Sequence, residues 1–136
     1  MMRKSIAWIL EFTCKLPQEE QVKCLQANDN YAIRMILKSV FDPQAIWALP
    51  PGAPPYAPCE HPHQEVMLYQ EARRLYLFIE GGNVNLKPLR RETMFVDLLQ
   101  SVDPADARLL LAAKEKTLPW PGLEAETVLQ AYPGLF

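Results

Sequence analysis

A proline-rich stretch in the middle of the chain limits the possible folds more than any other feature. Residues 49–62 read Leu-Pro-Pro-Gly-Ala-Pro-Pro-Tyr-Ala-Pro-Cys-Glu-His-Pro and hold six of the thirteen prolines in the 136-residue sequence. Proline lacks the backbone N–H that helices and sheets use, so this stretch must form an extended crossover. It could be a linker between domains or an ordered loop. We expect an ordered loop, because the flanking pieces are too small to fold alone.

The segments on both sides of this loop have helical periodicity. In Ser5–Leu16, the apolar residues Ile6, Ile9, Leu10 and Phe12 fall at helical spacing, with Ser5 as a cap. A helix capped by Asp29 or Asn28 should bury one stripe and point Arg34 and Lys38 outward. Gln64–Glu80 is the longest periodic segment, and Gly81-Gly82 is a helix stop.

The sequence also contains signals for the start of a helix at Pro17, Pro88, Asp103 and Glu124. No alternating strand pattern is present. The sequence therefore predicts an all-α fold in which residues 1–136 form one compact domain of six or seven helices, crossed by the proline-rich loop at about 49–62. A hydrophobic content of 49% is enough for one core without disulfides or metals.

The cysteines and the N-terminus indicate a location inside a cell. Cys14, Cys24 and Cys59 form an odd set without framework spacing, which suits a reducing compartment. The N-terminus starts with basic residues, but Glu11 and Lys15 interrupt the apolar run before it reaches signal-peptide or membrane-span length. We expect no membrane association.

Positive charge accumulates only in residues 69–91, which carry five basic and two acidic side chains in a chain of net charge -2. Binding of nucleic acid must therefore come from a local patch. Asn83 and Asn85 are available there for hydrogen bonds to sugar or base edges. The candidate phosphate contacts are Arg73, Arg74, Lys87, Arg90 and Arg91. The alternative is that Glu71, Glu80 and Glu92 pair with these cations on an ordinary solvated face.

No enzyme chemistry is evident. Cys59, His61 and His63 are metal-capable, but zinc would need a fourth ligand, so we expect a polar loop and no metal. A phosphate-cradling loop is not indicated, because Gly81-Gly82 follows a helix rather than a strand. We therefore expect no cofactor and no catalytic residues.

Five segments carry a resemblance to a known family: Ile9-Leu-Glu-Phe12, Asn28-Asp-Asn-Tyr-Ala-Ile-Arg-Met-Ile-Leu37, Leu77-Phe-Ile-Glu80, the helix Asp103–Lys116, and Ala131-Tyr-Pro-Gly-Leu-Phe136. Read end to end, the chain resembles small uncharacterised proteins of tailed phages, notably cyanophages. More distantly, it is similar to the N-terminal helical DNA-binding domain of phage ATP-dependent DNA ligases. In those ligases the domain is all-helical and grips duplex DNA across the minor groove beside the nick. The resemblance implies a nucleic-acid-facing viral protein in the host cytoplasm, or alternatively in the virion.

The chain departs from the ligases at the residues that matter for ligation. No lysine stands in a Lys-x-Asp-Gly context, and the chain has no room for a nucleotidyltransferase domain. A Thr-Gly-Asn-Ala-type loop of the ligases is replaced by Asn85-Leu-Lys-Pro-Leu-Arg-Arg-Glu92, so side-chain cations stand where a glycine would let backbone approach phosphate. Ligation is excluded.

Two hypotheses follow. The first is a non-enzymatic accessory protein that binds duplex DNA through the basic surface of residues 69–91. The alternative is a helical protein–protein adaptor in phage replication, host takeover or the virion, without nucleic-acid binding. The adaptor would contact its phage or host protein through the aromatic side chains Trp47 and Tyr56 in and beside the proline-rich loop. The acidic overall charge favours the adaptor, and the resemblance favours DNA.

Overall fold

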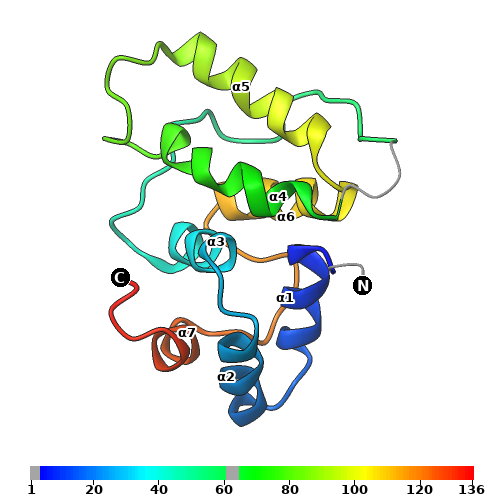
Figure 1. The fold of residues 1–136 in the computed structure, drawn as a ribbon. Helices are drawn as coiled ribbons and strands as arrows, with labels where there is room; N and C mark the ends of the chain where they lie inside the picture. Colours follow the sequence, from blue (N-terminus) through cyan, green and yellow to red (C-terminus); the bar gives the residue numbers. More distant parts are fainter. Residues whose placement is uncertain (1–3, 61–64) are drawn as a thin grey trace.

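The computed structural model describes residues 4–60 and 65–136 of the chain. Over these residues the protein is all-helical, which confirms the predicted fold class (Figure 1). The α-helices are α1 (Ile6–Cys14), α2 (Gln18–Ala27), α3 (Tyr31–Phe41), α4 (Met67–Glu71), α5 (Pro88–Ser101), α6 (Pro104–Lys114) and α7 (Ala125–Ala131), with one 3-10 helix, η1 (Ala72–Phe78), directly after α4. Among the described helices, none has the length and apolar character that a membrane crossing requires.

Helix α3 lies at the centre of the molecule and packs on α4, η1 and α6. Its inward residues Ile33, Ile36 and Leu37 are completely buried. Helix α5 lies at one end of the molecule, where it contacts η1 and α6, and α2 packs on α7 at the opposite end (Figure 1). The basic segment predicted from the charge count therefore lies at the α5 end.

Most helix starts follow the local signals in the sequence. The hydroxyl of Ser5 accepts a hydrogen bond from the backbone N–H of Trp8 (3.1 Å), and Asp103 caps α6 through the N–H of Ala105 (3.0 Å). Pro88 is the first residue of α5. The predicted cap of α3 was wrong by one or two positions, since Asn30 accepts the capping hydrogen bond.

The helix predicted over Gln64–Glu80 is wrong in its second half, and Gln64 itself lies outside the described residues. The chain leaves the α-helix after Glu71, continues as η1 and is extended at Ile79. The N–H of Ala48 donates to the carbonyl of Phe78, and the N–H of Glu80 donates to the carbonyl of Ile46, both at 2.7 Å. This short antiparallel bridge takes the backbone groups that a longer helix would have used.

The described part of the proline-rich loop, residues 49–60, crosses the surface from the end of α3 to the far end of α5 (Figure 1). The ammonium of Lys114 donates to the carbonyl of Pro50 (2.8 Å), and Glu115 accepts from the N–H of Gly52 (3.1 Å). The side chain of Gln100 accepts from the N–H of Ala57 (3.0 Å). These side chains supply the hydrogen bonds that the loop does not make with itself, as expected for an ordered loop.

Candidate nucleic-acid interface

A groove of about 300 Å³ lies between the α4–η1 stretch and α5. Arg74 lines it from η1, and Arg90 lines it from the first turn of α5. The hairpin formed by η1 and α5 thus brings together two cations that are separated in the sequence. The groove is lined by Glu71, Arg74, Phe78, Arg90, Met94, Asp97, Leu98 and Ser101. It therefore presents two guanidinium groups and two carboxyl groups over an apolar base.

The cations of this groove are accessible to solvent. The side chain of Arg74 is 69% exposed, and its Nε lies 3.8 Å from Oε2 of Glu71, one turn earlier. An exposed ion pair of this length holds the arginine weakly. Arg90 is exposed as well, and Arg73 and Lys87 are exposed outside the lining of the groove. Within the described ranges, no ion pair involves Arg73, Lys87 or Arg90.

Arg91 has a different environment from its neighbour Arg90. It is half-buried, and its Nε donates to the carbonyl of Leu77 (2.9 Å). One terminal nitrogen donates to the carbonyls of Asn83 (3.3 Å) and Leu86 (3.0 Å). The guanidinium thus ties the connection between η1 and α5 to the first turn of α5, and Arg91 holds the hairpin together instead of facing the groove.

The two predicted asparagines lie in this connection. The side-chain oxygen of Asn83 accepts from the N–H of Asn85 (3.1 Å), which forms a local turn. Asn83 is half-buried, and Asn85 is exposed. Neither lines the groove that contains Arg74 and Arg90.

The aromatic residues assigned to the adaptor alternative do not form an exposed surface. Trp47 is only 8% exposed, and its Nε1 donates to the carbonyl of Ser39 (3.1 Å). Its ring packs edge-on against Phe95. Trp47, which we expected to contact a partner, is therefore a core residue that leaves little of its surface for one. Tyr56 is half-buried and packs against the core.

The metal-capable residues of the loop are only partly described. Cys59 is half-buried, whereas His61 and His63 lie outside the described residues. Across residues 4–60 and 65–136, no cluster of three or more histidine, cysteine, aspartate or glutamate side chains could hold a metal ion.

Helix α1 carries an aromatic surface that the sequence reasoning missed. Trp8 is 45% exposed and Phe12 is 47% exposed, although Phe12 was expected on the buried side. Their rings stack with centroids 5.4 Å apart and planes only 9° apart, and Nζ of Lys4 lies 5.0 Å from the Trp8 ring. Their spacing of four residues, opposite the buried stripe of Ile6, Ile9 and Leu10, was the available signal.

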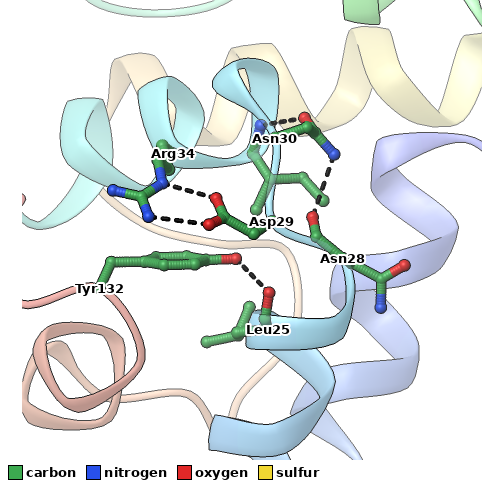
Figure 2. A network of polar contacts seen from close by, with 7 residues as sticks. Leu25, Asn28, Asp29, Asn30, Arg34 and Tyr132 are labelled. Atoms are coloured by element: carbon green, nitrogen blue, oxygen red, sulfur yellow. Dashed lines mark hydrogen bonds and ion pairs between the residues drawn. The ribbon is translucent and has the colours of Figure 1, made fainter.

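These two rings line a second pocket of about 300 Å³ between α1, the turn that joins α2 to α3, and Tyr69 of α4. Figure 2 shows how the turn is fixed. Arg34, which was expected to point outward, forms a bidentate pair with Asp29 (2.6 and 2.8 Å) and lies over the ring of Tyr132. The arginine holds the pKa of the Asp29 carboxyl below its usual range. The hydroxyl of Tyr132 donates to the carbonyl of Leu25.

This network brings together two of the segments that carried the family resemblance. The turn at Asn28–Asn30 and the closing segment around Tyr132 lie side by side, although they are about a hundred residues apart in the chain (Figure 2). The side chain of Asn30 caps α3 and also donates to the carbonyl of Asn28 (3.0 Å). The wall of the second pocket is therefore rigid.

Comparison with curated proteins and with solved structures finds no match. One protein-family model matches residues 9–119. These residues include all of the lining of the groove between η1 and α5. The match brings no link to phages or to DNA ligases, so that resemblance stays a prediction. Because the matched residues are more than half of the sequence, the chain belongs to this family, which is described as a family of unknown function (DUF6433).

Proposed function

We propose that the protein is a non-enzymatic DNA-binding protein that holds the phosphate backbone of duplex DNA in the groove between η1 and α5. The observation that carries this proposal is the meeting of Arg74 and Arg90 in one groove, with Arg73 and Lys87 exposed beside it. In the setting that the phage resemblance implies, it would act as an accessory protein in the host cytoplasm.

The charges of the groove determine what kind of binding to expect. Guanidinium groups make bidentate, charge-assisted hydrogen bonds to phosphate oxygens. Glu71 and Asp97 lie in the same groove and weaken its positive potential. The net charge of the chain, -2, gives no long-range attraction to DNA. Binding should therefore be modest in affinity and should depend on the few cations at the groove.

A fluorescence anisotropy titration of labelled duplex DNA at low and moderate salt tests this proposal. Neutralisation of about four phosphates predicts a slope of log K against log salt of roughly -3 to -4. The double variant Arg74→Glu, Arg90→Glu should lose binding. The double variant Lys15→Glu, Lys23→Glu makes the same change in net charge at two exposed cations outside the groove, so it is the matched control and should bind like the wild type. The proposal fails if duplex does not bind at low salt, or if Arg74→Glu, Arg90→Glu binds as well as the control.

The adaptor alternative is favoured by one observation. The loop that begins at Pro50 presents exposed prolines while Lys114, Glu115 and Gln100 hold its backbone in place. An extended proline segment that is already ordered loses little entropy when an aromatic-lined groove binds it. Proteins that co-purify with the tagged chain should then include a stoichiometric partner that is lost from the double variant Pro55→Ser, Pro58→Ser, since both prolines are exposed. An unchanged set of proteins would contradict this alternative.

A further inference from the structure

The pocket beside Trp8 and Phe12 has a stacking surface and a cation. Large aromatic side chains that stay half-exposed next to each other on a helix often mark a binding surface. Trp8 and Phe12 are held parallel by their mutual stacking, and Nζ of Lys4 lies over the Trp8 ring, 5.0 Å from its centroid. A planar ring that enters the pocket would meet a pair of stacked aromatic rings, with a positive charge over the face of the Trp8 ring.

The other wall of the pocket is polar and rigid. Asn28, Asp29 and Asn30 line it, and the network around Arg34 fixes their backbone. The amide nitrogen of Asn28 donates to the carbonyl of Cys24 (2.8 Å), and within the part of the chain that the structure describes no group donates to its side-chain oxygen. That oxygen can accept a hydrogen bond from an amino or imino group of a ligand.

The size of the pocket limits what it can hold. At about 300 Å³ it lies at the lower end of small-molecule sites. It accommodates one planar ring system and is too small for a helix of a partner protein, whose diameter with side chains is about 10–12 Å. A flat ring with polar edges fits this combination of shape and chemistry.

The pocket beside Trp8 and the groove between η1 and α5 lie on two sides of the α4–η1 stretch. Tyr69 of α4 lines the pocket, and Glu71 and Arg74 line the groove. The exposed residues between these two edges include Gln70 and Arg73. A chain that leaves the groove at Arg74 therefore needs to cross only the width of one helix, past Arg73, to reach the aromatic rings.

We propose that this pocket binds an unpaired nucleobase, stacked against Trp8 and Phe12, from a strand whose phosphates continue over α4 to the basic groove. The inference rests on the proposed DNA binding and adds to it a preference for DNA with a single-stranded segment next to duplex. The base must be unpaired, because bases inside a duplex are already stacked on one another. Arg73 and Lys4 lie where they can contact the phosphates on either side of that base.

The test compares three labelled DNAs of the same duplex sequence. The first has blunt ends, the second has a short single-stranded thymine tail on each end, and the third has abasic tails of equal length in the same places. The abasic tail has the same phosphates but no bases. The thymine tail should bind more tightly than the abasic tail by roughly five- to a hundredfold, as expected for one stacked base. Phe12→Ala and Trp8→Leu should remove that difference, and Trp8→Phe should retain part of it. Tyr31→Ala is the control, since this ring is 55% exposed and does not line the pocket.

The outcomes separate this inference from the proposed function. Equal binding of thymine and abasic tails overturns the inference, as does a base-dependent gain that survives in both Phe12→Ala and Trp8→Leu. If the blunt duplex still binds and Arg74→Glu, Arg90→Glu abolishes that binding, only the base pocket has failed. If neither the blunt nor the tailed duplex binds, the proposed function has failed as well. Thermal unfolding of each variant shows whether it is folded under the conditions of the titration.

Discussion

Asp106 and Ala7, which are 99 residues apart in the sequence, are joined by a hydrogen bond of 2.8 Å in which the backbone N–H of Ala7 donates to Oδ1 of Asp106. The carboxyl of Asp106 is completely buried, and its Oδ2 has no hydrogen-bond partner among the described residues. The first turn of α1 is thus capped twice, by its own Ser5 and by a side chain of α6. This contact fixes the helix that carries Trp8 and Phe12.

The burial of Asp106 predicts a pH dependence of stability. Burial raises the pKa of its carboxyl to about 7, against the opposing effect of the Ala7 hydrogen bond and with smaller contributions from Asp103 and Glu65. The folded protein therefore keeps a proton that the unfolded chain has already lost. The free energy of unfolding should fall as pH rises from about 4 to about 7, by up to about 1.4 kcal/mol per pH unit.

Urea unfolding at a series of pH values measures this slope. Asp106→Asn keeps an oxygen that can accept from Ala7 and removes the ionisation, so its stability should vary less over the same pH range. A wild-type slope that persists unchanged in Asp106→Asn would show that another group is responsible.

Removal of one hydroxyl should loosen the attachment of the C-terminal segment. Tyr132 is 1% exposed, and its hydroxyl donates to the carbonyl of Leu25 (Figure 2). The Leu25 carbonyl also accepts from the backbone N–H of Asn28 (3.2 Å), so Tyr132→Phe removes one of two hydrogen bonds and should lower the free energy of unfolding by about 0.5–1.5 kcal/mol. The aromatic ring beneath Arg34 is retained. Tyr31→Phe removes an exposed hydroxyl and should leave the unfolding midpoint unchanged, and an equal midpoint for the two variants would argue against this account.

The two adjacent glycines should differ in their response to substitution. A Cβ on Gly81 would meet open space, so Gly81→Ala should cost only the strain of its positive φ of +84°, about 1–2 kcal/mol. A Cβ on Gly82 would lie 1.8 Å from the carbonyl oxygen of Tyr76, so the backbone must move. Gly82→Ala should therefore lower the unfolding midpoint more than Gly81→Ala, and the reverse order would contradict the structure of this turn.

The features that the sequence predicts correctly depend on local contacts. Ser5 and Asp103 accept hydrogen bonds from N–H groups of the turns that they cap, and Pro88 starts a helix because the first turn needs no N–H from it. The end of the α4 helix was not predictable in this way. It depends on pairing with residues 46–48, on the other side of the proline-rich loop.

The candidate site could be predicted only in part, because some of its features depend on contacts between residues that are remote in the sequence. Counting charges identified Arg74 and Arg90, but it gave Arg91 the same role, because the composition of a segment does not show which of its cations the fold buries. It could not recognise Asp106 as a buried group, since its partner Ala7 is remote in the sequence. Trp8 and Phe12 had a visible spacing, but their exposure depends on how the turn between α2 and α3 lies beside α1.

Arg90 and Arg91 are neighbours in the sequence and were both predicted to contact phosphate, but their environments in the structure differ. The guanidinium of Arg91 donates to the carbonyls of Leu77, Asn83 and Leu86, and hydrogen bonds from a charged group contribute more than neutral ones. Arg91→Met should lower the free energy of unfolding by about 1–3 kcal/mol. Arg91→Lys should recover only part of this loss, because one ammonium cannot reproduce the forked geometry of the guanidinium.

Arg90→Met should leave the free energy of unfolding within about 0.5 kcal/mol of the wild type, since this side chain is exposed. It should weaken duplex binding, because it removes one of the two cations that line the groove. Thermal unfolding and duplex titration of both variants at the same salt concentration measure the two effects separately. If Arg91→Met is as stable as the wild type while Arg90→Met is not, the roles are reversed. If, in addition, Arg91→Met weakens duplex binding and Arg90→Met does not, direct phosphate contact belongs to Arg91, and the groove between η1 and α5 loses its main support as the DNA-binding surface.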